Sequence, residues 1–286
     1  MNNQQPQTRD FTVDGLTFSS QIWGNPNGIP VIALHGWLDN SASFFKLAPL
    51  LDSCYIVAID MAGHGKTDHR LGSFPYNIWE DVAEIFAIAD QLGWEKFALM
   101  GHSRGGIIAA LAAGTFPERI THLALIEGIL PEYTNGKDAP KQLALSIQGI
   151  KNQSQKQRTL YANIETAVVA RENGMFPLSH EAAKALTLQG VVQTEKGYHW
   201  STDQRLLAPS SVKLLPDQIF AFINHISAPI HLVLATEGMP KMYPNYMEFV
   251  KGFSHVKYTL LEGGHHLHME EQVEDVANVF RQSLFT

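Results

Sequence analysis

The sequence predicts an α/β protein built on a doubly wound, mostly parallel sheet. Compact apolar runs recur from Pro30 onward, helical patterns lie between them, and glycine-bearing turns follow several of the runs. Strands buried on both faces of a parallel sheet read as such continuous apolar runs. Their alternation with helices implies right-handed crossovers. The four clearest runs are VIALHG, CYIVAID, KFALMGH and HLALIEG.

The composition is that of a globular protein. The chain has 286 residues, of which 45% are hydrophobic and 17% charged, and this favours a packed core over disorder. The length suits one large core or one domain with a sizeable insertion. The formal charge of −7 argues against nucleic acid or an anionic membrane as a partner. No block of like charges forms an interaction tail.

Cysteine and targeting signals point to the cytoplasm. Cys54, the single cysteine, lies inside an apolar run and is expected to be a buried strand thiol. The polar start of the chain lacks the order of a signal peptide, and no apolar run is long enough to span a membrane.

The first half of the chain can be assigned element by element. Residues 1–8 are expected to be a disordered tail, and Asp14-Gly15 separates two short alternating segments that read as an antiparallel hairpin. Helical spacing of apolar residues and the position of Pro117 define three helices. The hairpin strands are Phe11–Asp14 and Thr17–Trp23, and the helices are Ser43–Leu51, Tyr76–Leu92 and Arg104–Thr115.

The alternation stops after Gly128. Residues 130–210 show helical patterns without convincing buried strands, including a helix capped by Ser179 that ends near Gly190, and are expected to form a helical cap. The core is therefore expected to comprise 9–129 and 211–286. Its second half is expected to contain helices at Pro216–Ile226, Tyr243–Phe253 and Glu270–Leu284 and strands at Pro229–Ala235 and Val256–Leu261.

The sharpest chemical signal is the segment GHSRG at 101–105, which follows an apolar run and begins a helix rich in small residues. In that context G-x-S-x-G is typical of a tight, strained strand-to-helix turn that presents a serine hydroxyl. Ser103 is the candidate nucleophile, and the backbone N–H of Arg104 is a candidate oxyanion donor. A glycine-bearing turn without catalysis is the alternative.

A second turn, HGW at 35–37, ends the run 31–34. Function gathers outside the carboxyl ends of strands in a doubly wound sheet, so this turn should lie close to Ser103. The N–H of Trp37 is the second candidate oxyanion donor. His35 precedes the turn glycine and is expected to brace the loop, although catalytic and substrate-binding roles stay open.

The segment GGHHLHME at 263–270 follows the last predicted strand. A general base arrives late in the chain for this order of catalytic residues. His265, directly after the glycine pair, is the candidate base. His266 and His268 could form a metal site with it, but no acid or cysteine is spaced to complete one, so no metal is expected.

Together these residues resemble the α/β-hydrolase superfamily over nearly the whole chain. The segment DMAGHGKT at 60–67 is similar to its D-x-x-G-x-G-x-S loop, and WSTDQRL at 200–206 is similar to a stretch of the serine-hydrolase-like proteins. The resemblance implies an eight-stranded sheet, a helical cap and cofactor-free hydrolysis of esters or related bonds. Trp200 is a candidate substrate-binding residue. Asp203 and Arg205 are expected to form an ion pair that fixes the insertion, with substrate contact as the alternative.

The catalytic acid departs from the family pattern. Relatives usually carry an aspartate just after strand 7, where this chain has Gly238 or Met239, and Glu237 lies slightly too early. Glu127 ends the strand next to that of Ser103, an arrangement that resembles some haloalkane dehalogenases. Glu127 is the favoured acid and Glu237 the alternative, while a strand-end carboxylate that only caps a loop is the plain interpretation of Glu127.

The predicted activity is hydrolysis of a carboxylic ester, thioester or lactone through an acyl-enzyme on Ser103. Dehalogenases and epoxide hydrolases of this fold use an aspartate nucleophile, so Ser103 argues against both. A cofactor-free perhydrolase or haloperoxidase and a small-molecule receptor with vestigial turnover stay open. The expected partner is a small ester substrate; its identity and the oligomeric state do not follow from the sequence.

Overall fold

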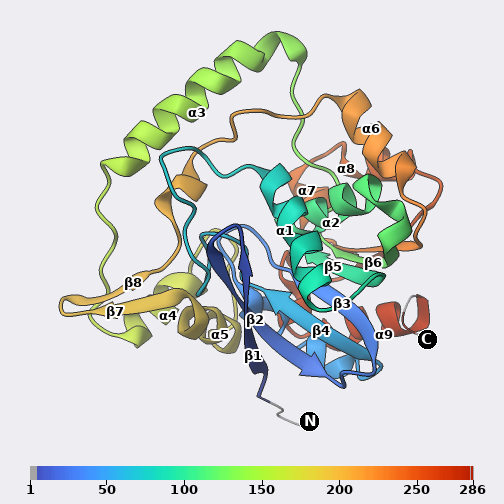
Figure 1. Cartoon of the computed structure of the whole chain (residues 1–286), viewed down its shortest axis with the longest axis horizontal. Helices are drawn as coiled ribbons and strands as arrows, with labels where there is room; N and C mark the ends of the chain where they lie inside the picture. The colour runs from blue at the N-terminus through green and yellow to red at the C-terminus, as the bar shows by residue number, and fades with distance from the viewer. Residues whose placement is uncertain (1–4, 284, 286) are drawn as a thin grey trace.

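A computed structural model describes residues 5–283 and 285. Its centre is an eight-stranded sheet in the order β1-β2-β4-β3-β5-β6-β9-β10 (Figure 1). The pairings β1–β2 and β2–β4 are antiparallel, and those from β4 to β10 are parallel. The strands are β1 (Gln7–Val13), β2 (Leu16–Gly24), β3 (Ile29–Leu34), β4 (Cys54–Ile59), β5 (Phe97–His102), β6 (Ile120–Ile126), β9 (Ile230–Ala235) and β10 (Val256–Leu261).

Helices cover both faces of this sheet. Alternate residues of β3 face opposite cores: Ile32 packs with α1, α2, α6 and α8, whereas Val31 packs with α9 and the short turns after β3. This two-sided burial explains why β3, β4 and residues 97–100 of β5 form continuous apolar runs. The helices of the core are α1 (Ile78–Gln91), α2 (Arg104–Thr115), α6 (Pro216–His225), α7 (Met239–Met242), α8 (Tyr246–Lys251) and α9 (Val273–Ser283).

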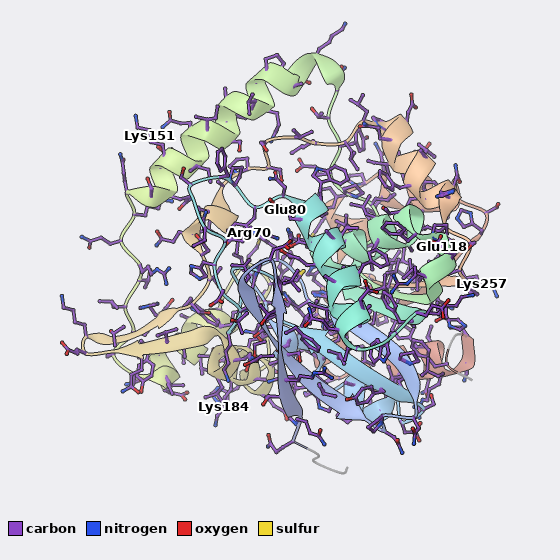
Figure 2. The ribbon with its side chains drawn as sticks, viewed as in Figure 1. Arg70, Glu80, Glu118, Lys151, Lys184 and Lys257 are labelled. Carbon is purple, nitrogen blue, oxygen red and sulfur yellow. The ribbon has the colours of Figure 1, made fainter. Side chains whose placement is uncertain are left out.

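Residues 130–210 form a mostly helical layer beside the sheet. The elements are α3 (Ala139–Ser154), α4 (Ile164–Glu172), α5 (His180–Gly190), β7 (Val191–Thr194), β8 (Gly197–Trp200) and a 3₁₀ turn at Gln204–Leu207. The Ser179 side chain caps α5 by accepting from Ala182 N. In Figure 1, α3 runs along the edge of the molecule, and Figure 2 shows Lys151 on the outer side of this helix.

A dense polar contact joins this layer to the core. Arg205 Nη2 lies 2.6 Å from Asp203 Oδ2, and the phenol of Tyr76 donates to the same oxygen at 2.9 Å. Arg205 also donates to the carbonyls of Arg70 and Gly72, in the loop before α1. The expected ion pair therefore exists, and it connects the segment after β8 to that loop. Near this loop, Figure 2 shows Arg70 close to Glu80, with which it forms an ion pair.

The structure corrects several boundaries. Gln7 and Thr8 pair with β2, so they are not a disordered tail, and residues 1–4 lie outside the described part of the chain. The predicted helix Ser43–Leu51 is two 3₁₀ turns, Ser41–Phe44 and Ala48–Leu50, because Pro49 provides no N–H to continue a helix. The predicted helix Tyr243–Phe253 begins only at Tyr246, after Pro244.

Two further features complete the fold. The β7–β8 hairpin was not expected, because its four-residue strands contain no buried residue and form no apolar run in the sequence. Cys54 is buried in β4, and burial raises the pKa of its thiol to about 11. In the described part of the chain no helix is both long and apolar enough to cross a membrane.

Candidate active site

Ser103 lies on the turn between β5 and α2. Its φ of 52° and ψ of −116° are strained for a residue with a side chain. The flanking glycines are required by close contacts: a Cβ on Gly101 would lie 2.5 Å from the Gly105 carbonyl oxygen, and one on Gly105 would lie 2.1 Å from that of Leu34. The G-x-S-x-G pattern therefore allows the tight turn that the sequence predicted.

His265 and Glu127 lie in direct contact. His265 Nδ1 is 2.9 Å from Glu127 Oε2, and both side chains are buried. The same carboxylate accepts from Ala235 N at 2.6 Å and from Met239 N at 2.7 Å. An ionised carboxylate only accepts hydrogen bonds, so Nδ1 of His265 is the donor and Nε2 is left with its lone pair.

Glu237, the alternative acid, lies elsewhere. Its side chain is 59% exposed and forms an ion pair with Lys241 on the surface. Glu127 reaches His265 because it follows β6, with a left-handed φ of 54° that turns the chain at the sheet edge. A Cβ on Gly238 would lie 1.9 Å from Glu127 Oε2, so the Glu127 carboxylate occupies the space in front of the loop after β9.

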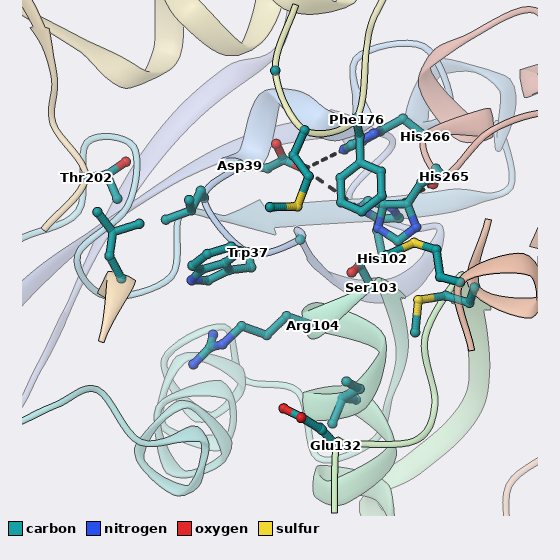
Figure 3. Close-up of a pocket in the computed structure, with 18 of the residues that line it drawn as sticks. Trp37, Asp39, His102, Ser103, Arg104, Glu132, Phe176, Thr202, His265 and His266 are labelled. Atoms are coloured by element: carbon teal, nitrogen blue, oxygen red, sulfur yellow. Dashed lines mark hydrogen bonds and ion pairs between the residues drawn. The ribbon is translucent and has the colours of Figure 1, made fainter. Parts of the chain in front are cut away.

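The two candidate oxyanion donors belong to turns at the carboxyl ends of adjacent strands. β3 and β5 pair in parallel, which brings Trp37 and Arg104 to one side of Ser103 (Figure 3). Within residues 5–283 and 285, neither backbone N–H donates a hydrogen bond. Arg104 Nη2 lies 2.6 Å from Asp81 Oδ2, which holds the guanidinium away from Ser103. The backbone of Arg104, and not its side chain, therefore faces the turn.

A pocket of about 1120 Å³ contains Ser103 and His265. Its wall includes Trp37 and Arg104 from the core, and Trp200 from the cap segment. Phe176, also from that segment, stacks on the His265 ring with centroids 4.3 Å apart. Large apolar side chains dominate the rest of the wall: Leu130, Tyr133, Met175, Met239, Met242, Tyr243 and Phe249.

His35 does not line this pocket. It is fully buried, its Nδ1 donates to the Gly36 carbonyl at 2.7 Å, and its Nε2 accepts from Met61 N at 3.0 Å. Burial lowers the pKa of His35, consistent with a neutral ring. The structure therefore corrects the substrate-binding hypothesis for His35, because both ring nitrogens are occupied by the backbone of the loops that they brace.

The other histidines of the last loop have separate partners. His266 Nε2 lies 3.1 Å from Asp39 Oδ2, and His268 Nε2 lies 2.8 Å from Ser43 Oγ. Of the three, only His265 contacts Glu127. The structure also brings an acid to this cluster, Asp39, which the spacing within 263–270 could not reveal.

No hydrogen bond joins the Ser103 hydroxyl to His265 in the described part of the chain. Catalytic contacts of this kind are often long in a ligand-free site and shorten in the complex. Ser103 and His265 nevertheless line the same pocket, together with Trp37 and Arg104, and buried Glu127 contacts His265 from behind the pocket wall. This arrangement can perform nucleophilic acyl transfer.

Comparison with known proteins agrees with this geometry. Residues 29–212 match the family described as alpha/beta hydrolase fold. A serine hydrolase-like protein of Danio rerio is 30% identical over 278 residues, which cover 92% of this chain and 84% of that protein. The chain belongs to the α/β-hydrolase family. The family supports a hydrolase function for the protein.

Two solved structures share its architecture. A hypothetical protein from Pseudomonas aeruginosa PAO1 has a TM-score of 0.92 at 38% identity, covering 96% of this chain and 98% of that chain. The thioesterase domain from the curacin biosynthetic pathway has a TM-score of 0.85 at 23% identity, covering 97% of this chain and all of that chain. At the latter identity the likeness shows the fold alone.

Sequence reasoning missed two members of the site. Phe176 lies in a loop between α4 and α5, and its sequence neighbours do not distinguish it from other exposed aromatic residues. Asp39 follows the HGW turn by two residues, and a carboxylate so close to a candidate oxyanion loop was a usable signal. Its partners, Arg171 and His266, come from distant parts of the chain and could not be paired without the fold.

Proposed function

We propose that this protein hydrolyses a carboxylic ester, thioester or lactone through an acyl-enzyme on Ser103. The observation that carries the proposal is the 2.9 Å contact between His265 Nδ1 and buried Glu127, in the pocket that contains the strained Ser103 turn. Structural ion pairs can be buried without catalysis, but here His265, whose Nε2 is free, lines the same pocket as Ser103, which is partly exposed.

In the first step, the Ser103 oxygen attacks the substrate carbonyl while His265 Nε2 takes the hydroxyl proton. The carbonyl π pair moves onto oxygen, and the N–H groups of Trp37 and Arg104 stabilise the negative charge. Glu127 holds Nδ1–H and stabilises the imidazolium. The tetrahedral intermediate collapses, His265 gives its proton to the departing alcohol or thiol, and an acyl ester remains on Ser103.

In the second step, water replaces the alcohol. His265 removes a proton from the water as its oxygen attacks the acyl carbon, and the same two N–H groups hold the new oxyanion. Collapse breaks the bond to the Ser103 oxygen, which recovers its proton from His265. The carboxylic acid leaves, and the protein returns to its starting state. Every proton is accounted for by these residues, the substrate and water.

The pocket wall supports a bulky, mostly apolar substrate. A volume of about 1120 Å³ exceeds what a short acetyl ester would fill, and the wall is rich in methionine and aromatic side chains. Burial of apolar substrate surface stabilises the complex by about 25 cal/mol per Å². We therefore expect kcat/KM to rise with acyl chain length across a series of esters with one alcohol.

The test is a panel of esters, thioesters and lactones of graded length, with the parent protein and Ser103→Ala compared at equal concentration. We expect the parent to turn over at least one ester series and the variant to lose nearly all activity with an unchanged melting temperature. Parent-like turnover by the variant would overturn the proposal. Tight binding of panel compounds without turnover by the parent would instead support the small-molecule receptor.

A further inference from the structure

Two buried hydrogen-bond acceptors face each other beside the triad. His102 Nε2 lies 3.0 Å from the carbonyl oxygen of His265, so Nε2 carries the proton and Nδ1 carries a lone pair. Nδ1 lies 3.9 Å from Asp39 Oδ2 (Figure 3) and has no hydrogen-bond partner within residues 5–283 and 285. Both side chains are at least 97% buried. A lone pair aimed at an anionic oxygen needs a donor or a cation between them.

The known partners of these groups do not resolve the contact. Asp39 Oδ1 accepts from Arg171 Nη2 at 2.8 Å, and Asp39 Oδ2 lies 3.1 Å from His266 Nε2. A proton on His102 Nδ1 would not make a hydrogen bond to Asp39 Oδ2, because the two atoms are 3.9 Å apart. The remaining answers are a bridging water and a metal ion.

We propose that Asp39, His102 and His266 bind a divalent transition-metal ion of the zinc class. Ligand atoms of the three residues lie within 4.8 Å of one another. A carboxylate oxygen and two imidazole nitrogens suit Zn²⁺, Co²⁺ or Ni²⁺ better than Mg²⁺ or Ca²⁺, which prefer oxygen ligands. A fourth position would be filled by water from the pocket, as in open zinc sites.

The two separations from Asp39 suit such an ion. Asp39 Oδ2 lies 3.1 Å from His266 Nε2 and 3.9 Å from His102 Nδ1. An ion at about 2.1 Å from each atom would subtend angles of roughly 95° and 135°, which bracket the tetrahedral value. On binding, the His266 Nε2 proton moves to Nδ1, which has no hydrogen-bond partner among the described residues, and the ring stays neutral.

The site is reached through the active-site pocket and adjoins the proposed catalytic residues. Asp39, His102 and His266 all contribute to the pocket wall. His102 directly precedes Ser103, and the ring centroids of His266 and His265 are 5.2 Å apart. A double positive charge here opposes formation of the His265 imidazolium, so a bound ion should inhibit hydrolysis by about tenfold or more.

Binding can be measured without any assumption about catalysis. Untagged, EDTA-treated protein is titrated with Co²⁺ while its visible d–d absorption is recorded, and with Zn²⁺ by calorimetry. We expect one ion per chain, with intense cobalt bands that indicate a four-coordinate site. Asp39→Asn and His266→Asn should each weaken binding by about tenfold or more. His180→Asn, at an exposed histidine that pairs with Glu172, should leave binding unchanged.

Location is settled by anomalous diffraction from crystals of the unsubstituted protein soaked in Co²⁺, which needs no variant to fold. An anomalous peak between the three side chains is expected. A peak elsewhere, binding that survives both ligand variants in folded protein, or a water at this point with no anomalous signal would overturn the proposal. Reversible inhibition by Zn²⁺ is an added readout that alone rests on the proposed hydrolase activity.

Discussion

Replacing Glu127 by glutamine removes one negative charge from a fully buried position with almost no change in shape. The carboxylate accepts three N–H groups, two of them on Oε2. Glutamine offers one oxygen and one NH₂, so at least one N–H must face another donor. If the NH₂ faces His265, the imidazole adopts the wrong tautomer for a base at Nε2.

The size of the effect follows from the 2.9 Å contact between Glu127 Oε2 and His265 Nδ1. Coulomb's law with an effective dielectric constant of about 20 gives roughly 6 kcal/mol between the carboxylate and the imidazolium at 2.9 Å. That corresponds to about 10⁴ in rate, the loss expected when a triad histidine loses its anion. We expect Glu127→Gln to lower kcat by about this factor with a smaller change in KM.

The assay is steady-state hydrolysis of the best ester from the panel, with melting temperatures recorded for each variant. Glu237→Gln is the matched control, because its side chain is 59% exposed and should cost less than twofold. A folded Glu127→Gln that keeps a tenth or more of the parent kcat would show that Glu127 does not orient or stabilise the His265 imidazole during catalysis. So would a larger loss in Glu237→Gln than in Glu127→Gln.

Three further outcomes are expected. A Cβ on Gly238 would lie 1.9 Å from Glu127 Oε2, so an aspartate at 238 can place its carboxylate where that of Glu127 was. Gly238→Asp should therefore raise the activity of Glu127→Gly at least tenfold, and as a single substitution it should lower the melting temperature. A folded double variant with no gain in activity would contradict this geometry. Burial, with the nearby Asp81 charge, raises the pKa of Glu84 from 4.5 to about 7. Protonated Glu84 therefore stabilises the fold fully below pH 4.5 and progressively less as pH rises to 7, whereas buried histidines with lowered pKa values act in the opposite direction over this range. In denaturant titrations, the free energy of unfolding of the parent minus that of Glu84→Gln should therefore fall by on the order of 2 kcal/mol between pH 4.5 and 7, and a difference independent of pH would contradict this. Removing either partner of the Asp203–Arg205 pair should lower the free energy of unfolding by about 3 kcal/mol, since it leaves a largely buried charge uncompensated. Denaturation midpoints equal to that of the parent would show that the pair does not stabilise the attachment of this segment.

The parts of the fold that could be predicted are those buried on both faces of the sheet. The apolar run that ends at Met100 and the small residues after Ser103 define β5 and α2, because burial forbids polar residues there. The position of Glu127 beside the candidate site was predicted in the same way, since parallel neighbouring strands end at one edge of the sheet. Its contact with His265 could then be expected from the order of the strands and from the histidine loop that follows the last strand.

The features that escaped prediction depend on contacts between distant loops. The chain of contacts from Arg171 through Asp39 to His266 spans three segments whose meeting point is set by the cap layer. The β7–β8 hairpin contains no fully buried residue, so its sequence has no buried apolar run. Phe176 reaches His265 from a loop, where side-chain direction does not follow a helical or strand period.

The nucleophile can be identified directly by covalent labelling. The parent protein is treated with a fluorophosphonate probe, and the labelled peptide is identified by mass spectrometry, with Ser103→Ala in parallel. One adduct per chain is expected, on Ser103, and none in the variant. An adduct on another residue, equal labelling of the variant, or no labelling of a protein that hydrolyses the ester panel would contradict the assignment of Ser103 as the nucleophile.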